Sequence, residues 1–110
     1  MAISAFSPFK IVDLSTHIAG PFSTKWLADY GADVIKVEPP GGSATRRFAP
    51  FYKGVEDPER SRYWWAYCLN KRSVALDLES RDGRSTFLQL AATADAILES
   101  FPPGYLDGLG

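Results

Sequence analysis

The sequence is poor in the residues that build disulfide frameworks, metal centres and membrane spans. Its 110 residues include one cysteine, Cys68, and one histidine, His17. One cysteine excludes an internal disulfide and fits a reducing compartment, so we expect a cytoplasmic protein. A lone histidine without a cysteine cluster does not predict a metal site. No run of about 18 consecutive apolar residues occurs, and we therefore expect no membrane span.

An excess of charge of one sign is also missing. The chain has 12 basic and 13 acidic residues, which leave a net charge of -1. Without a basic surplus it has no general attraction for polyanions, which argues against a nucleic-acid-binding protein. Hydrophobic residues make up 45% and charged residues 23%. These values are typical of a globular domain, and the length suits one domain or part of one.

Two apolar stretches are separated by a short helical pattern. The stretches cover residues 10–14 and 33–37, and each is long enough for one buried strand. Between them, Pro21 suits the first turn of a helix and Gly31 suits its C-terminal cap. We therefore expect a strand–helix–strand unit of the kind that forms parallel sheets.

The intervening helix carries large apolar residues at helical spacing. They are Phe22, Trp26, Leu27 and Tyr30. A stripe with this period predicts one buried helix face, so we expect these side chains to lie in the core.

The rest of the chain continues the alternation after a long irregular segment. Residues 73–78 and 95–99 predict strands, and residues 81–93 predict a helix that Ser80 caps and that buries Phe87, Leu88 and Leu90. Residues 105–109 predict one turn of a further helix. Strands that alternate with helices predict an α/β fold with a parallel sheet and right-handed crossovers. Residues 43–62 predict an irregular loop, and residues 63–69 fit either a short helix or a buried extended segment.

The turn after the first strand is where open α/β sheets bind ligands. It contains His17 and the Gly20-Pro21 pair, which marks a helix start, where free backbone N–H groups suit an anion. No G-x-G-x-x-G and no P-loop follow the strand, so the standard dinucleotide and nucleoside triphosphate signals are absent. Glu38, at the end of the second strand, resembles a ribose-binding acid. Lys71-Arg72 is either a solvated basic pair or a phosphate-binding pair.

Aromatic residues are concentrated between residues 48 and 67. Such a group is more typical of packing than of a stacking platform for bases. It is too large for a short chain to bury easily, which favours a surface covered by a partner or by another domain.

Three stretches together resemble the N-terminal part of the family III CoA-transferases, a superfamily that also includes α-methylacyl-CoA racemases and formyl-CoA transferase. The stretches are IVDLSTHIAGPFSTKWLADYGADVIKVEPPGG, NKRSVALDLESRDGR and ADAILESFPPGYLDGLG. They occur in the family's order and spacing and span residues 10–110.

The resemblance implies the fold and the role of the chain. Residues 1–110 would be the N-terminal part of a Rossmann-like large domain, with the small domain and the catalytic region absent. The family's catalytic aspartate lies downstream of Gly110, so we expect no catalytic residue here. The chain would supply part of the coenzyme A site of an enzyme that transfers CoA between carboxylic acids. The alternatives are an acyl-CoA racemase-like member, a catalytically inactive fragment or an interaction subunit. The family also implies an interlocked homodimer, or else a partner chain that completes the fold.

The resemblance also implies the residues that contact coenzyme A. They are His17, Ile18, Ala19, Val37, Glu38, Pro39, Arg46, Lys71, Arg72, Ser100 and Phe101. Residues 17–19 would lie beside the thioester, residues 37–39 along the adenosine, residues 71–72 near the phosphates and residues 100–101 beside the pantetheine. Many members carry an arginine after the acid at position 38, where this chain has prolines, so Arg46 or Arg47 would substitute. Ser100 replaces a common asparagine, and Gly108 replaces an arginine that often contacts CoA.

Overall fold

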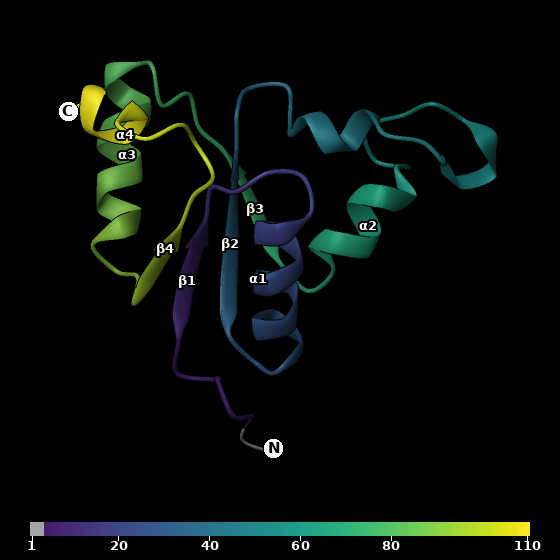
Figure 1. The fold of residues 1–110 in the computed structure, drawn as a ribbon, viewed down its shortest axis with the longest axis horizontal. Coiled ribbons are helices and arrows are strands. Elements are labelled where there is room, and N and C mark those ends of the chain that lie inside the picture. The colour runs from purple at the N-terminus through teal and green to yellow at the C-terminus, as the bar shows by residue number, and fades with distance from the viewer. Residues whose placement is uncertain (1–3) are drawn as a thin grey trace.

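A four-stranded parallel sheet with the strand order β3-β2-β1-β4 is the centre of the structure (Figure 1). The computed structural model describes residues 4–110. The strands are β1 (Lys10–Asp13), β2 (Asp33–Glu38), β3 (Arg72–Ala75) and β4 (Ala96–Leu98). The helices are α1 (Ala19–Asp29), α2 (Arg62–Cys68), α3 (Arg81–Ala91) and α4 (Tyr105–Gly108). The expected α/β fold with a parallel sheet is therefore confirmed.

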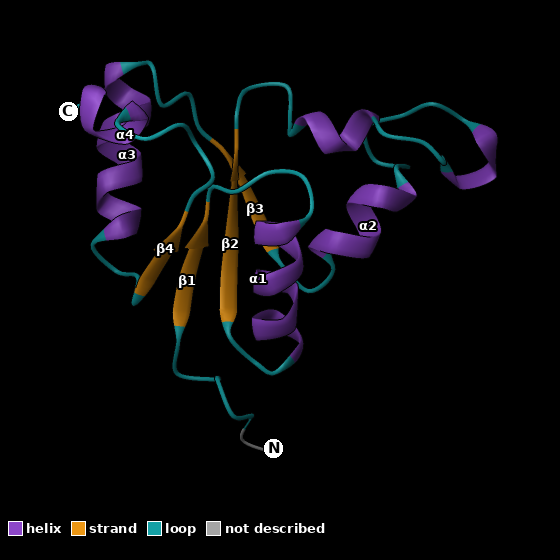
Figure 2. Ribbon diagram, viewed as in Figure 1, coloured by secondary structure: helices purple, strands orange, loops and turns teal. Residues whose placement is uncertain are grey.

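The two faces of the sheet have separate cores. Ile11 and Val34 point to one face, where they pack on α1 through Ala28 and Leu27. Val12, Leu14 and Val37 alternate with them and point to the other face, where a second cluster includes Phe87 and Leu90 of α3. Figure 2 shows α1 and α3 on either side of the strands. This alternation follows directly from the two-residue period of a strand.

The side of α1 that packs on the sheet is not the side that the sequence predicts. Phe22, Trp26 and Tyr30 are 46%, 50% and 53% exposed, so the expectation that they lie in the core is wrong. The buried residues of α1 are Pro21, Thr24 and Ala28. These small side chains let the helix backbone approach the sheet closely, and the large aromatic residues are left on the outer side.

Helix α3 follows its expected pattern more closely. Ser80 caps it by accepting a hydrogen bond from the Gly83 N–H at 2.9 Å. Phe87 and Leu90 pack against the sheet, whereas Leu88 is 60% exposed, contrary to expectation. Strand β3 ends at Ala75 and not at residue 78, because Asp77 starts a turn in which it accepts a hydrogen bond from the Glu79 N–H.

The segment between β2 and β3 contains short helical pieces. They are the 3-10 helices η1 (Ala44–Arg47) and η2 (Tyr52–Gly54), followed by α2. Ser61 caps α2 by accepting a hydrogen bond from the Trp64 N–H at 3.2 Å. Of the two structures that the sequence allowed for residues 63–69, the helix is therefore the correct one.

The new orientation of α1 predicts how two substitutions affect stability. Ile11→Ala removes a side chain that is 7% exposed and should lower the free energy of unfolding by about 2–5 kcal/mol. Trp26→Ala should cost about 1 kcal/mol, the size of an aromatic contact, because half of this ring is exposed. Denaturant titration of both variants checks this. A larger cost for Trp26→Ala than for Ile11→Ala would contradict the orientation of α1.

Candidate functional site

The carboxyl ends of β1 and β4 form the centre of the site. Strand β1 lies between β2 and β4. The strands that directly follow β1 in the chain extend to one side of it, and β4 lies on the other side, so the strand order reverses between β1 and β4. In open α/β sheets, ligands bind at such a switch point. The segments that follow these two strands are joined by a hydrogen bond of 3.0 Å, which the Thr16 N–H donates to the Ser100 Oγ.

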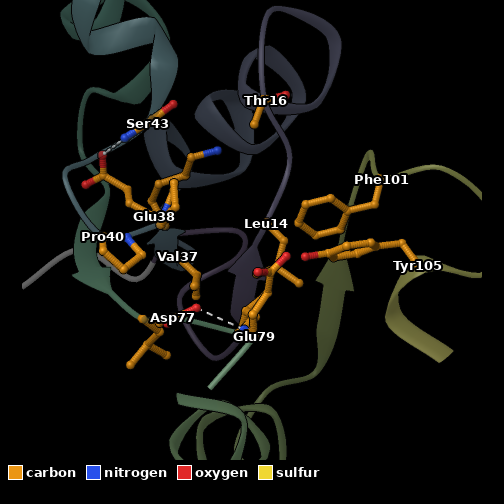
Figure 3. A pocket seen from close by; sticks show the side chains of 14 residues that line it. Leu14, Thr16, Val37, Glu38, Pro40, Ser43, Asp77, Glu79, Phe101 and Tyr105 are labelled. Atoms are coloured by element: carbon orange, nitrogen blue, oxygen red, sulfur yellow. Dashed lines mark hydrogen bonds between the residues drawn. The ribbon is translucent and has the colours of Figure 1, made fainter. Parts of the chain in front are cut away.

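A cavity of about 330 Å³ opens at this edge (Figure 3). Its lining comes from the ends of all four strands and from α4, and comprises Leu14, Thr16, Lys36, Val37, Glu38, Pro39, Pro40, Ser43, Leu76, Asp77, Leu78, Glu79, Phe101 and Tyr105. Apolar side chains predominate in this lining, and the charged members are mainly carboxylates. The cavity therefore suits an uncharged part of a ligand better than an anionic part.

One wall of the cavity is a pair of aromatic rings. Phe101 and Tyr105 lie with their ring centroids 4.6 Å apart and their planes at 36°. Figure 3 shows both rings next to Leu14, at the end of β1. Phe101 also packs against the cluster under α3, so the sheet core supports this wall.

Glu38 is held in a network and is not free to bind a ribose. The Arg46 guanidinium donates to both of its oxygens, at 2.6 and 2.9 Å, and the Ser73 hydroxyl and the Ser43 N–H also donate to it. Burial alone would raise the pKa of Glu38, but the hydrogen bonds from Arg46 and Ser73 hold it below its usual value. The guanidinium also lies 4.0 Å from the centroid of the Trp64 ring. Glu38 thus anchors the β2–β3 segment to the sheet.

A second network lies beneath the turn after β1 and is centred on Asp13. This carboxylate is fully buried and accepts hydrogen bonds from the Ser15 N–H at 2.8 Å and from the Thr24 hydroxyl at 2.6 Å. Its ion-pair partners are Lys36 at 3.6 Å and Lys71 at 3.1 Å, whose side chains are 2% and 1% exposed.

The electrostatic consequence is an ionised carboxylate in the interior. Burial would raise the pKa of Asp13, but Lys36, the hydroxyls of Ser15 and Thr24, and Lys71 together hold it below its usual value. Burial lowers the pKa of Lys36, and Asp13 opposes this effect.

The sequence contained a signal for this network that we did not use. Asp13 follows Ile11 at an interval of two residues, and Lys36 follows Val34 in the same way. Each charged residue must therefore share a sheet face with an apolar residue that a helix covers. Two opposite charges on one covered face predict a buried pair.

The turn itself presents its side chains at the surface. His17 is exposed and adopts a left-handed backbone conformation with φ of 65°. Its ring lies 6.2 Å from that of Phe48, between the ring centroids. Ile18 is 51% exposed and Ala19 is also exposed. Residues 17–19 are thus available to a ligand at the edge where the resemblance expects the thioester.

The expected phosphate-binding pair is divided between two places. The Lys71 ammonium donates to the Asp13 carboxylate and to the Pro21 carbonyl at 2.9 Å, so it points into the interior. Arg72 is exposed and pairs with Asp33 at 2.7 Å, at the start of β2. This pair lies towards the amino ends of the strands, whereas the cavity lies at their carboxyl ends; Asp33 and Glu38 are roughly 17 Å apart along β2.

Of the residues expected to contact coenzyme A, the structure gathers some at the cavity and leaves others apart. Val37, Glu38, Pro39 and Phe101 line it. Thr16 lines the cavity, precedes the turn at residues 17–19 and donates a hydrogen bond to Ser100, so Ser100 and this turn lie next to the cavity. Arg46, Lys71 and Arg72 do not line it and are engaged in ion pairs with Glu38, Asp13 and Asp33, respectively.

Two general features of residues 4–110 bear on the kind of site. Within this range, no group of three or more His, Cys, Asp or Glu side chains is placed to hold a metal ion. No helix in the same range is both long and apolar enough to cross a membrane.

Comparison with known proteins identifies the family. The model of CoA-transferase family III matches residues 7–110. The chain belongs to this family.

Named relatives of this family III chain are CoA-transferases. Succinyl-CoA:(R)-benzylsuccinate CoA-transferase subunit BbsE of Thauera aromatica is 43% identical over 105 residues, which are 96% of this chain and 25% of the relative. The human succinyl-CoA:glutarate CoA-transferase is 41% identical over 102 residues, 92% of this chain and 22% of that protein. The chain thus spans about a quarter of the length of the curated relatives it matches.

Solved structures of family members share the fold. The crystal structure of the Mycobacterium tuberculosis protein Rv3272 superposes with a TM-score of 0.86 at 35% identity, and covers 98% of this chain and 28% of its own. A CAIB/BAIF family protein from Brucella suis also gives a TM-score of 0.86, at 36% identity, covering 96% of this chain and 28% of its own. The family III chain therefore corresponds to one segment of a larger fold, and the recognition of the family from the sequence is confirmed.

The anchoring role of Glu38 predicts a pH-dependent loss of stability. Glu38→Gln should lower the free energy of unfolding at neutral pH by about 1.5–3 kcal/mol, because it weakens charge-assisted hydrogen bonds to Arg46. The pKa of Glu38 is lower in the folded chain than its ordinary value of 4.5. Its stabilising effect is therefore complete above that value and is lost as the pH falls through the folded pKa.

Melting temperatures measured from neutral to acidic pH check this prediction. The difference between the unmodified chain and Glu38→Gln should shrink on acidification. Glu59→Gln is the matched control, because the side chain of Glu59 is 82% exposed and contacts Arg46 only at 3.4 Å. A difference for Glu38→Gln that stays constant with pH would contradict the network.

Proposed function

We propose that this chain forms part of the coenzyme A site of an enzyme that transfers CoA between carboxylic acids. The observation that carries the proposal is the cavity at the β1–β4 switch point, which is lined by Val37, Glu38, Pro39 and Phe101. These are residues that the resemblance assigns to the adenosine and the pantetheine. The relatives named above are CoA-transferases, which favours transfer over racemisation.

The character of the cavity supports an uncharged part of coenzyme A as its occupant. Its apolar side chains and the paired rings of Phe101 and Tyr105 suit contact with adenine or with the pantetheine arm. The carboxylates of Asp77 and Glu79 at the same cavity would repel phosphates but can accept hydrogen bonds from hydroxyl or amino groups. The phosphates would then lie outside this cavity.

Arg47 is the arginine best placed to act beside the adenine. Arg46 is committed to Glu38 and Trp64. Arg47 is exposed, occurs in none of the ion pairs found within residues 4–110, and has its guanidinium near Gly41, next to Pro40 of the cavity. It therefore takes over the role that the sequence left open between Arg46 and Arg47.

The role of the chain in the reaction is binding and not bond making. Residues 17–19 would form the wall of the acyl pocket beside the thioester. The catalytic aspartate implied by the family matches no position in residues 1–110, which would be the N-terminal part of the large domain. We place the protein in the cytoplasm, because its single cysteine suits a reducing compartment.

A protein partner is also part of the proposal. The outer side of α1 carries Phe22, Trp26 and Tyr30, each about half exposed, and we call this surface the aromatic face. The rings of Trp26 and Tyr30 are stacked at 6.0 Å, which presents a continuous apolar surface. Exposed patches of this kind are typical of interfaces. We propose that a second copy of the protein, as in an interlocked homodimer, or a partner chain covers it.

Coenzyme A binding is the direct test of the site. Arg47→Gln should weaken CoA binding two- to five-fold, since an exposed cation over an aromatic ring contributes about 0.5–1 kcal/mol. Isothermal titration calorimetry measures this. Arg62→Gln is the matched control, because Arg62 is an exposed arginine on α2. Absence of CoA binding by the unmodified protein would overturn the proposed function, and equal effects of the two variants would overturn the role of Arg47.

The partner surface has its own test. Trp26→Ser should shift the protein towards a smaller assembly, because it removes the central ring of the aromatic face. Size-exclusion chromatography with light scattering measures the mass. Leu88→Ser, which changes an exposed apolar side chain on α3, is the control and should leave the mass unchanged. A monomer at the chain's own mass before any substitution would argue against the homodimer.

A further inference from the structure

The turn between β1 and α1 is tied down at both of its ends by the buried network around Asp13. At the first end, the Asp13 carboxylate accepts hydrogen bonds from the N–H and hydroxyl of Ser15, and Lys36 donates to the Ser15 carbonyl. At the far end, the Thr24 hydroxyl donates to Asp13, and the Lys71 ammonium joins Asp13 to the Pro21 carbonyl. Between these ties, residues 17–19 are exposed, and they include the strained backbone of His17.

The network places charged side chains at positions where apolar side chains could also support the fold. Asp13 and Lys36 face α1 alongside Ile11 and Val34, where apolar residues would also fill the space. Buried ion pairs add little net stability compared with well-packed apolar residues, because desolvation offsets their attraction. They do fix geometry, because each donor and acceptor must be satisfied in one arrangement. Within residues 4–110, every buried side-chain nitrogen and oxygen has a hydrogen-bond partner.

A close approach between the two ends of the turn adds to the constraint. A side-chain carbon at Gly20 would collide with the Ser15 side chain. Ser15, whose hydroxyl is bound to Asp13, therefore packs directly against the first turn of α1. The backbone at residues 16–19 has to bridge these two fixed points, which accounts for the left-handed conformation at His17.

We propose that Asp13, Lys36 and Lys71 are positioning residues that hold the turn at residues 16–19 in its ligand-binding shape. Lys71 thus influences ligand binding from beneath the turn and makes no direct contact with a phosphate. This inference rests on the proposed function, in which the same turn lies beside the CoA thioester. It assigns the buried network to the preorganisation of that site, because a turn fixed before binding loses less conformational entropy when the ligand arrives.

The first experiment measures the turn without any ligand. Lys71→Met keeps the length of the side chain and leaves Asp13 paired with Lys36, so no buried carboxylate loses its counter-charge. Backbone amide exchange of residues 15–20, followed by NMR, should become faster in this variant while the strands keep their protection. Lys25→Met is the matched control, because Lys25 pairs with Asp29 on the surface of α1.

A second pair of variants separates the network from general loss of stability. Thr24→Val keeps the shape of the side chain but removes the hydroxyl that binds Asp13, and Thr24→Ser keeps this hydroxyl. Faster exchange in the turn of Thr24→Val, with recovery in Thr24→Ser, supports positioning. Exchange that is unchanged in both Lys71→Met and Thr24→Val, or that rises equally throughout the chain, overturns it.

The second experiment distinguishes positioning from direct phosphate contact. Dissociation constants of CoA and of 3′-dephospho-CoA are measured for the unmodified protein and for Lys71→Met. Positioning predicts that Lys71→Met weakens both ligands by the same factor, roughly three- to thirty-fold. A loss confined to CoA would show that Lys71 binds the 3′-phosphate and would overturn the inference. If the unmodified protein binds neither ligand, the proposed function fails, whereas the amide-exchange result still decides whether the network fixes the turn.

Discussion

The buried carboxylate of Asp13 is the constraint on which the rest of the structure depends. It accepts hydrogen bonds from residues just after β1, in α1 and just before β3, and forms an ion pair with Lys36 of β2. Elements far apart in the sequence thus meet at one group whose charge must be neutralised, because an unpaired buried carboxylate would be very costly. The sheet, the first crossover helix and the turn between them are therefore fixed together.

A second ionic anchor organises the opposite side of the same edge. Glu38 at the end of β2 binds Arg46, and Arg46 lies over Trp64, so one salt bridge holds the start of a long irregular segment and the helix that ends it. The cavity lies between this anchor and the rings of Phe101 and Tyr105. One side of the cavity is therefore supported by a salt bridge and the other by packed aromatic rings, which makes the shape of the site a property of the fold.

The sequence predicted the fold well and the site only in part. Alternation of apolar stretches located the strands, since each strand buries its own local pattern. The orientation of α1 was wrong because large aromatic residues dominate a hydrophobic pattern, whereas a helix that packs closely on a sheet selects small ones such as Thr24 and Ala28. Lys71 was expected at the surface. Its neighbour Arg72 is exposed, and sequence position alone could not show that the lysine side chain reaches back to Asp13.

The two sides of α1 lie in different surroundings. Its inner side, with Pro21, Thr24 and Ala28, is constrained by the close contact with the sheet and by the ionic network. Its outer side, with Phe22, Trp26 and Tyr30, is about half exposed and contributes little to the core of this chain. A single eleven-residue helix thus has one side that stabilises the fold and one side that is proposed to contact a partner. In the proposed assembly, substitutions on the inner side would alter whether the chain folds and substitutions on the outer side would alter what it assembles with, so screens for thermal stability would overlook the second kind.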